Sequence, residues 1–252
     1  MRKVRIISRI DVKNEFAIKG IHLEGLRKVG NPNDLAKKYF EEGIDEIIFM
    51  DAVASYYDRN SLSEIISNAT KDVFVPITVG GGIRNINDIQ IALNSGADKV
   101  AINTQAVKNP LFIKEASEVF GSQCIVASIE AKRTNQSSWE AYYDNGRESS
   151  QKDVVEWAKE LEQLGAGELM ITSVDNEGTK KGFDYSLIKE IFNTINIPVI
   201  CCGGAGKLEH FNKIFESTDV DAIAAASVFH YSMLEIKNIK TSLANHGVAV
   251  RK

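Results

Sequence analysis

Short apolar runs and longer amphipathic segments alternate along the whole chain. Eight of the apolar runs are rich in β-branched residues and lack strict apolar/polar alternation, at residues 4–10, 46–50, 73–79, 99–102, 124–129, 168–172, 198–201 and 222–225. Near-continuous apolarity is typical of parallel strands that are covered on both faces. We therefore expect a parallel sheet with two buried faces.

Segments with helical periodicity separate these runs, at residues 32–42, 62–68, 86–94, 110–120, 153–164, 185–192, 208–215 and 236–245. Asn31-Pro32 is a helix start signal, and glycines stand where helices should end, at Gly43, Gly96, Gly121 and Gly165. Strand and helix thus alternate eight times, which predicts an α/β fold of the (β/α)8 TIM barrel type. An open doubly wound sheet is the alternative.

The second half of the chain repeats features of the first. The matched pairs are Asp11 with Glu130, Asp51 with Asp175, and Gly81 with Gly203. Their spacing is nearly constant and close to half of the 252 residues, which indicates an internal repeat. We expect one barrel domain over 1–252 with half-repeats of about 1–122 and 123–252, because no linker divides the chain at its midpoint. Equivalent halves favour a closed barrel over an open sheet.

Composition narrows the function classes. The net charge of −4 and the pI near 5.7 disfavour a strongly basic nucleic-acid binder. No apolar run reaches the roughly 18 residues that a membrane span needs, and the N-terminus lacks a signal-peptide core. We expect a cytoplasmic protein.

Cysteine and histidine usage gives no sign of a disulfide framework or a metal site. Cys124, Cys201 and Cys202 all lie in predicted strands, where they are expected to act as small core residues. The four histidines show no ligand spacing. No motif indicates a metal or another cofactor.

Two acids follow predicted barrel strands at the ends where barrel enzymes carry their catalytic residues. Asp11 and Glu130 each end an apolar run, and the carboxyl ends of barrel strands form the catalytic face. For either acid alone, a helix cap or a loop salt bridge explains the position equally well. Their symmetric placement favours a general acid and a general base on opposite sides of one mouth. Long connections at 13–31 and 131–152 follow these acids directly, and we expect them to cover the mouth as binding loops.

Glycine runs with small polar neighbours predict two phosphate sites. A glycine turn at the carboxyl end of a strand lets backbone N–H groups approach an anion, although one such turn alone is usually a tight connection. Each half has one, followed one strand later by a small polar cluster. The candidate phosphate-binding residues are Gly81, Gly82, Asn103, Thr104, Gly203, Gly204, Ala226 and Ser227. Two symmetric sites imply an elongated ligand with a phosphate at each end.

Other charged residues are weaker candidates. Asp51, Asp175 and Glu177 could bind substrate hydroxyls or cap helices. Lys19 lies in the first long connection and could reach an anionic substrate, although an exposed lysine usually has no specific role.

At the opposite ends of the strands, four charged residues could meet in a ring on the barrel floor. They are Arg5, Glu46, Lys99 and Glu168. From their spacing alone, a stabilising ion cluster is the simpler explanation, because the bottom of a barrel generally serves stability.

An ordered series of motifs runs from residue 3 to the C-terminus. They are Asp11-Val-Lys13, Val79-Gly-Gly-Gly-Ile-Arg84, Ala97-Asp-Lys-Val100, Asn103-Thr104, Gly121-Ser-Gln-Cys124, Gly165-Ala-Gly-Glu168, Gly203-Gly-Ala-Gly206 and Ala225-Ala-Ser-Val-Phe-His230. With them the chain resembles the cyclase subunits of imidazole glycerol phosphate synthase.

The resemblance implies an enzyme that takes ammonia from a separate glutaminase subunit. Cyclase subunits join it to a bis-phosphorylated ribulosyl aminoimidazole carboxamide nucleotide, yielding imidazole glycerol phosphate and aminoimidazole carboxamide ribotide. The resemblance makes Asp11 a catalytic acid or base with Glu130 at its partner's position. It also makes the charged ring an ammonia gate, with the glutaminase docked beneath it and Asp98 near that interface.

Several residues depart from the pattern of these subunits. Glu130 stands where they have aspartate, and so does Glu177, which precedes the candidate substrate-binding Gly178. Ser8-Arg9 and Cys201-Cys202 replace small or neutral residues beside the site. An added methylene shifts a carboxyl by about 1 Å, and such a misplacement can lower a rate about 100-fold.

These departures leave other functions open. One is a paralogous ammonia-channelling subunit of a sugar amidotransferase that makes acetamidino groups. Another is a non-catalytic barrel that activates a glutaminase. A sugar-phosphate isomerase of the sister type is a third, disfavoured because it needs no ammonia gate.

Overall fold

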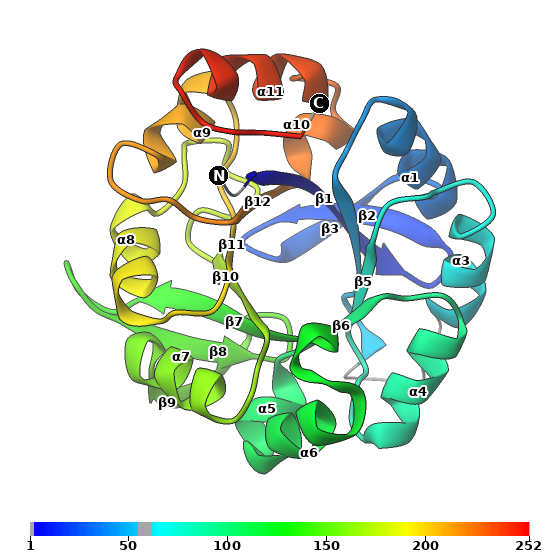
Figure 1. Ribbon diagram of the computed structural model, residues 1–252, viewed down its shortest axis with the longest axis vertical. Helices are drawn as coiled ribbons and strands as arrows, with labels where there is room; N and C mark the ends of the chain where they lie inside the picture. The colour runs from blue at the N-terminus through cyan, green and yellow to red at the C-terminus, as the bar shows by residue number, and fades with distance from the viewer. Residues whose placement is uncertain (1–2, 55–61, 252) are drawn as a thin grey trace.

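Eight parallel strands close into a barrel with helices around it (Figure 1). The computed structural model describes residues 3–54 and 62–251. The barrel strands are β1 (Arg5–Lys13), β4 (Glu46–Asp51), β5 (Ile77–Gly80), β6 (Lys99–Ile102), β7 (Ile125–Arg133), β10 (Glu168–Ser173), β11 (Val199–Cys202) and β12 (Ala222–Ala225). The cylinder closes because β1 pairs in parallel with both β4 and β12, and β7 pairs in parallel with both β6 and β10. The predicted (β/α)8 barrel is confirmed, and the open sheet is excluded.

The outer layer consists of helices that follow the barrel strands. They are α1 (Pro32–Glu41), α3 (Leu62–Ala69), α4 (Ile86–Asn94), α6 (Leu111–Phe120), α7 (Val154–Gln163), α8 (Tyr185–Thr194), α9 (Leu208–Ile214) and α11 (Ile236–Asn245), with the short α5 (Thr104–Lys108), α10 (Ser227–His230) and η1 (Ser122–Cys124) beside them. The predicted start of α1 is confirmed, since the Asn31 side chain accepts hydrogen bonds from the N–H groups of Asn33 and Asp34. None of the helices within the described ranges is both long and apolar enough to cross a membrane.

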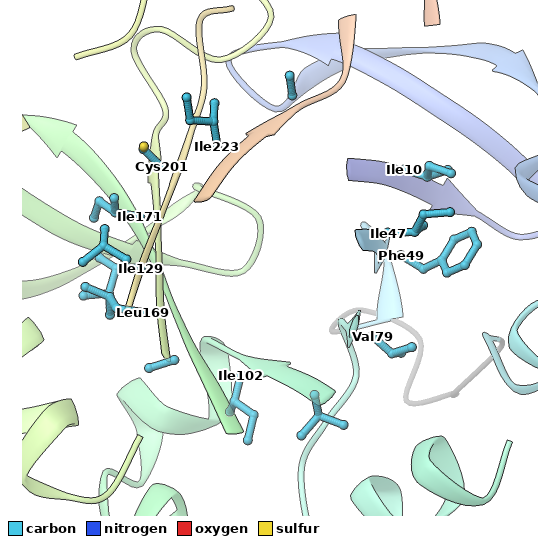
Figure 2. Close-up of a cluster of buried hydrophobic side chains, with 14 of the residues drawn as sticks. Ile10, Ile47, Phe49, Val79, Ile102, Ile129, Leu169, Ile171, Cys201 and Ile223 are labelled. Atoms are coloured by element: carbon cyan, nitrogen blue, oxygen red, sulfur yellow. The ribbon is translucent and has the colours of Figure 1, made fainter. Parts of the chain in front are cut away.

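Alternation along each strand divides the buried residues between two cores. Figure 2 shows Ile10, Phe49 and Ile129 among the buried side chains between the sheet and the helices. A separate apolar cluster fills the barrel interior and includes Ile7 and Met170. Since successive side chains of a strand point to opposite faces, every second residue of β1 faces the interior.

One predicted strand begins too early, and two end too soon. The run at 73–79 becomes a strand only at Ile77, because the Val73 N–H bonds to the Ala69 carbonyl at the end of α3 and Pro76 has no N–H. Strands β1 and β7 extend to Lys13 and Arg133 because each continues into a hairpin.

The long connections at 13–31 and 131–152, which were expected as binding loops, contain β-hairpins. The first hairpin contains β2 (Phe16–Ile21) and β3 (Glu24–Gly30), and the second contains β8 (Trp139–Tyr143) and β9 (Glu148–Asp153). β2 pairs antiparallel with β1, and β8 pairs antiparallel with β7. The two hairpins therefore extend matching strands of the two halves of the barrel.

Candidate functional site

Asp11 lies at the mouth of the barrel in a buried ion network. Its carboxylate accepts a hydrogen bond from Arg9 Nε at 2.8 Å and is 3.5 Å from Lys19 Nζ. Burial alone would raise the pKa of Asp11, but the charges of Arg9 and Lys19 outweigh it and hold the pKa below its ordinary value. Asp11 is therefore a carboxylate at neutral pH.

Arg9 reaches across the barrel interior. Its Nη1 lies 3.3 Å from Thr172 Oγ1 on β10 and 3.9 Å from Cys202 Sγ on β11. The side chain is 2% exposed. A buried guanidinium thus links β1 to strands on the other side of the cylinder, above the apolar interior.

Lys19 connects the first hairpin to the loop after β10. Its ammonium group contacts the Glu177 carboxylate, and both side chains are buried. Burial disfavours the ammonium form, but the Glu177 and Asp11 charges more than compensate and raise the pKa of Lys19. The alternative of an exposed lysine without a specific role does not hold, because two carboxylates keep Lys19 inside the site.

Glu130 has a different environment from Asp11. It is buried on β7 and accepts a hydrogen bond from the Gly146 N–H at 2.7 Å. Burial raises the pKa of Glu130 to about 7, although the Arg9 charge and the Gly146 hydrogen bond lower it in part. The two acids thus differ in protonation, and the environments that separate them suit one base and one acid.

A cavity of about 280 Å³ lies beside Glu130 and Arg9. Four predicted phosphate-binding residues line it, namely Gly81, Gly82, Asn103 and Thr104. Gly81 has φ +89°, and a side chain there would collide with the Asp51 backbone carbonyl at 2.3 Å. The turn therefore requires glycine and brings its backbone close to any ligand in this cavity.

The polar side chains of this cavity also bind the second hairpin. Asn103 Nδ2 donates to the Tyr142 carbonyl at 3.2 Å, and Thr104 Oγ1 donates to Asp144 Oδ1 at 3.1 Å. Asn103 Oδ1 is buried and lacks a hydrogen-bond partner among the described residues. A ligand here would meet one polar atom that is not yet satisfied.

The second glycine turn lies in a tighter place. Gly178, Gly203, Gly204, Ala226 and Ser227 line a cavity of only about 10 Å³. A larger cavity of about 580 Å³ adjoins it and is lined by Gly178 and Ser227 together with basic side chains, namely Lys19, Arg27 and Lys180. The two predicted phosphate positions therefore belong to separate cavities, with the ion network of Asp11 and Lys19 between them.

Two lesser candidates differ in their placement. Asp51 lines the first cavity, and its Oδ1 accepts the Val53 N–H at 2.9 Å. Asp175 is exposed and lines neither cavity, because its carboxylate accepts the Arg133 N–H at 2.8 Å. The structure does not bring Asp175 together with the other site residues.

The four charged residues on the barrel floor form a closed ring of ion contacts. Arg5 contacts Glu46 at 2.7 Å and also contacts Glu168. Lys99 Nζ lies 2.9 Å from Glu168 and 3.4 Å from Glu46. The apolar interior that contains Ile7 lies between this ring and Arg9.

The two hairpins meet over the mouth. Asn145 Nδ2 donates to the Leu23 carbonyl at 3.1 Å, and the His22 N–H donates to the Glu177 carbonyl at 2.8 Å. Asn145 also lines the first cavity, while Gly20 at the other hairpin lines the 580 Å³ cavity. The two long connections thus cover the mouth of the barrel, as expected, and they do so as β-hairpins.

Sequence reasoning left some site residues without a role. Arg9 and Cys202 are marked in the sequence only as departures from the family pattern, and Cys202 also as a core residue. Lys108 lines the first cavity from α5, and its spacing in the sequence gives no signal of this. Among the described residues, no group of three or more potential ligands could hold a metal ion.

Comparison with known proteins gives consistent matches. The His_biosynth family model, described as "Histidine biosynthesis protein", matches residues 5–235. The "Imidazole glycerol phosphate synthase subunit HisF" of Legionella pneumophila is 57% identical over 212 residues, which are 84% of this chain and 100% of that protein. HisF of Clostridium botulinum (strain Okra / Type B1) is 44% identical over 248 residues, and HisF of Helicobacter hepaticus is 44% identical over 247 residues, each covering 98% of both chains.

Proposed function

This chain belongs to the histidine biosynthesis protein family, and because its relatives over nearly the whole length are HisF subunits, we propose that it is the cyclase subunit of an imidazole glycerol phosphate synthase. The enzyme joins ammonia to the bis-phosphorylated ribulosyl aminoimidazole carboxamide nucleotide. Its products are imidazole glycerol phosphate and aminoimidazole carboxamide ribotide, and it works in the cytoplasm.

The observation that carries this proposal is the difference between the two carboxyls at the mouth. Addition of ammonia to a carbonyl carbon needs a base that takes a proton from nitrogen and an acid that supplies one to oxygen. Asp11 is held as a carboxylate by Arg9 and Lys19, which suits the base. Glu130 has a pKa of about 7 and suits the acid.

The phosphates of the nucleotide are assigned to the two glycine turns. The cavity under Gly81 and Asn103 takes one phosphate on backbone N–H groups and the Thr104 hydroxyl. The other phosphate binds at Gly203 and Ser227, where the adjoining cavity supplies cations such as Lys180. A single ligand that occupies both cavities has to displace part of the Lys19 contacts, because those contacts separate the two spaces.

Ammonia enters from the floor of the barrel. Arg5, Glu46, Lys99 and Glu168 form the gate, and the apolar interior above it offers a path for an uncharged molecule. The partner is a glutaminase subunit that docks on this N-terminal face as the other half of a heterodimer. Phe74 lies just before β5 on the same face and is 75% exposed, which suits a contact with that partner.

A sugar amidotransferase subunit is the second candidate. It is favoured by Glu130, Glu177 and Arg9, which give the centre of the site one added cation and two longer acids. In this case the ring and the partner keep their roles, and only the acceptor changes. The identity of 44% over 98% of the chain with HisF subunits places the cyclase first.

The proposed activity is tested with ammonium chloride in place of the partner. Purified chain, ammonium chloride at pH 8.5 and the bis-phosphorylated nucleotide should yield both products. Absence of turnover in wild-type chain that still binds a glutaminase would reject the cyclase and favour the amidotransferase. Turnover that persists unchanged in Asp11→Asn would reject the assigned base and point to a barrel that only activates a glutaminase.

A further inference from the structure

Arg9 is a charged side chain in the barrel interior that the proposed reaction does not use directly. Three of its contacts fix its position, namely Asp11 at 2.8 Å, Thr172 at 3.3 Å and Cys202 at 3.9 Å. These partners come from β1, β10 and β11. Such a side chain is preorganised, because its position is set before any ligand arrives.

One nitrogen of this guanidinium remains available. Nε binds Asp11 and Nη1 binds Thr172 and Cys202, whereas Nη2 has no hydrogen-bond partner within residues 3–54 and 62–251. Arg9 lines the 280 Å³ cavity together with Gly81, Asn103 and Glu130. The wall of this cavity thus includes both a buried cation and a glycine turn.

The carboxylates near Arg9 lie on one side of it. Asp11 contacts both Arg9 and Lys19, and Glu177 contacts Lys19. Glu130 lies on the cavity side of Arg9 and, with a pKa of about 7, is protonated in a large fraction of molecules at neutral pH. An anion that enters the cavity therefore meets a buried guanidinium whose Nη2 group can still donate hydrogen bonds.

We propose that Arg9 is a specificity-determining residue that binds a carboxylate of a ligand whose phosphate occupies the Gly81–Gly82 turn. The inference rests on the proposed function in that the glycine turn is taken as a phosphate site. It goes beyond that function, because the nucleotide substrate carries no carboxylate, and it adds a ligand class, namely small phosphate esters that carry a carboxylate a few bonds away from the phosphate. The planar guanidinium suits a carboxylate because both groups form directed, charge-assisted hydrogen bonds.

Two small probes separate the carboxylate contact from the phosphate contact. 3-Phosphoglycerate carries a phosphate and a carboxylate on three carbons, and glycerol 3-phosphate has a hydroxymethyl group in place of the carboxylate. Isothermal titration of the full chain at pH 7.5 should show 3-phosphoglycerate binding roughly tenfold more tightly, as expected for one added hydrogen bond to a charged group.

The preference should depend on Arg9 itself. Arg9→Met should lose it and bind the two probes equally, while Arg9→Lys should keep part of it. Lys108 provides a matched control, because it lines the same cavity with a side chain that is 55% exposed. Lys108→Met removes the same charge at the rim and should leave the preference between the probes in place.

The outcomes distinguish this inference from the proposed function. Equal binding of both probes to wild-type chain rejects the role of Arg9 and leaves the phosphate site standing. Binding of neither probe rejects both. A preference that survives in Arg9→Met also rejects the role of Arg9. If circular dichroism shows that Arg9→Met is unfolded, the comparison of wild type with Arg9→Lys decides the question. The preference for 3-phosphoglycerate should then be present in wild type and reduced in Arg9→Lys.

Discussion

Arg9 Nε donates a hydrogen bond to Asp11 Oδ1 at 2.8 Å, so a cation of the barrel interior and the proposed base form one buried pair on strand β1. The pair lies on one strand because alternate residues share a face. Asp11 also contacts Lys19 from the first hairpin. A change at any of these three residues is therefore expected to alter the other two.

Replacement of Asp11 by asparagine should impair both activity and stability. We expect ammonium-dependent turnover to fall roughly 100-fold or more, since a positioned base contributes about that much. The free energy of unfolding should fall by about 3 kcal/mol, because Arg9 and Lys19 lose their shared counter-charge in a buried place. Steady-state kinetics and urea denaturation measure the two effects. Asp34→Asn, on the exposed side of α1, is the control and should change neither by a comparable amount.

The rate should depend on the protonation of Glu130. Its pKa of about 7 means that the acid form predominates below neutral pH and declines above it. With Glu130 as the proposed acid, the turnover number corrected for free ammonia should fall as pH rises through about 7. Glu130→Gln should have a much lower turnover number, and that number should not fall with rising pH in this range. A wild-type profile that is flat between pH 6 and pH 8 would contradict the assignment.

Glu130 should also destabilise the protein at high pH. The pKa of Glu130 is higher in the folded protein than in the unfolded chain, so the folded state holds this proton to higher pH. The free energy of unfolding therefore falls as the pH rises from the pKa of the unfolded chain through about 7. A difference of this size corresponds to about 3 kcal/mol. Glu130→Gln lacks the ionisation and should unfold at a higher temperature than wild type at pH 8.5. At pH 4.5 the two proteins should melt close together, as differential scanning calorimetry can show.

Loss of Arg5 should open the ring on the barrel floor. Arg5→Ala leaves Glu46 and Glu168 with only Lys99 between them, and we expect a loss of about 3 kcal/mol in the free energy of unfolding. In the complex with glutaminase, glutamine hydrolysis should outpace product formation, whereas ammonium-dependent turnover should persist. Lys37→Ala breaks an exposed contact with Asp72 and should cost less than about 1 kcal/mol. Complete coupling in Arg5→Ala would argue that the ring only stabilises the barrel.

Alanine at Gly204 should disrupt the second glycine turn. Gly204 has φ +105°, and a Cβ atom there would lie 2.0 Å from the Gly182 carbonyl oxygen. Gly25→Ala is the control, because Gly25 also has a positive φ but nothing lies within 4 Å of an added Cβ. We expect Gly25→Ala to lose about 1 kcal/mol. Gly204→Ala should lose several times more in thermal unfolding, and it should weaken binding of inorganic phosphate.

The regular part of the barrel could be predicted because local pattern and tertiary role agree. The predicted runs at 99–102 and 222–225 coincide with β6 and β12, and the predicted helices at 86–94 and 236–245 coincide with α4 and α11. These segments are buried on the faces that their periodicity indicates. The placement of Asp11 and Glu130 at strand ends followed from the same reasoning.

The hairpins were harder to predict, for different reasons in the two halves. The turn of the first uses His22 and Leu23, both with positive φ, where Asn-Gly is the usual signal. Contacts with distant residues hold this conformation: the His22 N–H donates to the Glu177 carbonyl at 2.8 Å, and the Leu23 carbonyl accepts from Asn145 at 3.1 Å. The second hairpin does carry Asn145-Gly146 at its turn, which is a strong sequence signal for a hairpin.

The role of Arg9 could not follow from its own position in the sequence. An arginine inside an apolar strand is unfavourable unless its partners are known, and Thr172 and Cys202 lie more than 160 positions away in the chain. Likewise, the environment of Glu130 depends on the Gly146 N–H, which lies 16 residues further along the chain in the turn of the second hairpin.

The tips of the two hairpins touch through Asn145 and Leu23, and Asn145 also lines the first cavity. A ligand that presses on Asn145 from inside the cavity therefore also loads the contact between the two halves of the barrel. We expect ligand exchange and motion of the hairpins to be coupled for this reason, as in enzymes whose turnover is limited by the movement of covering segments.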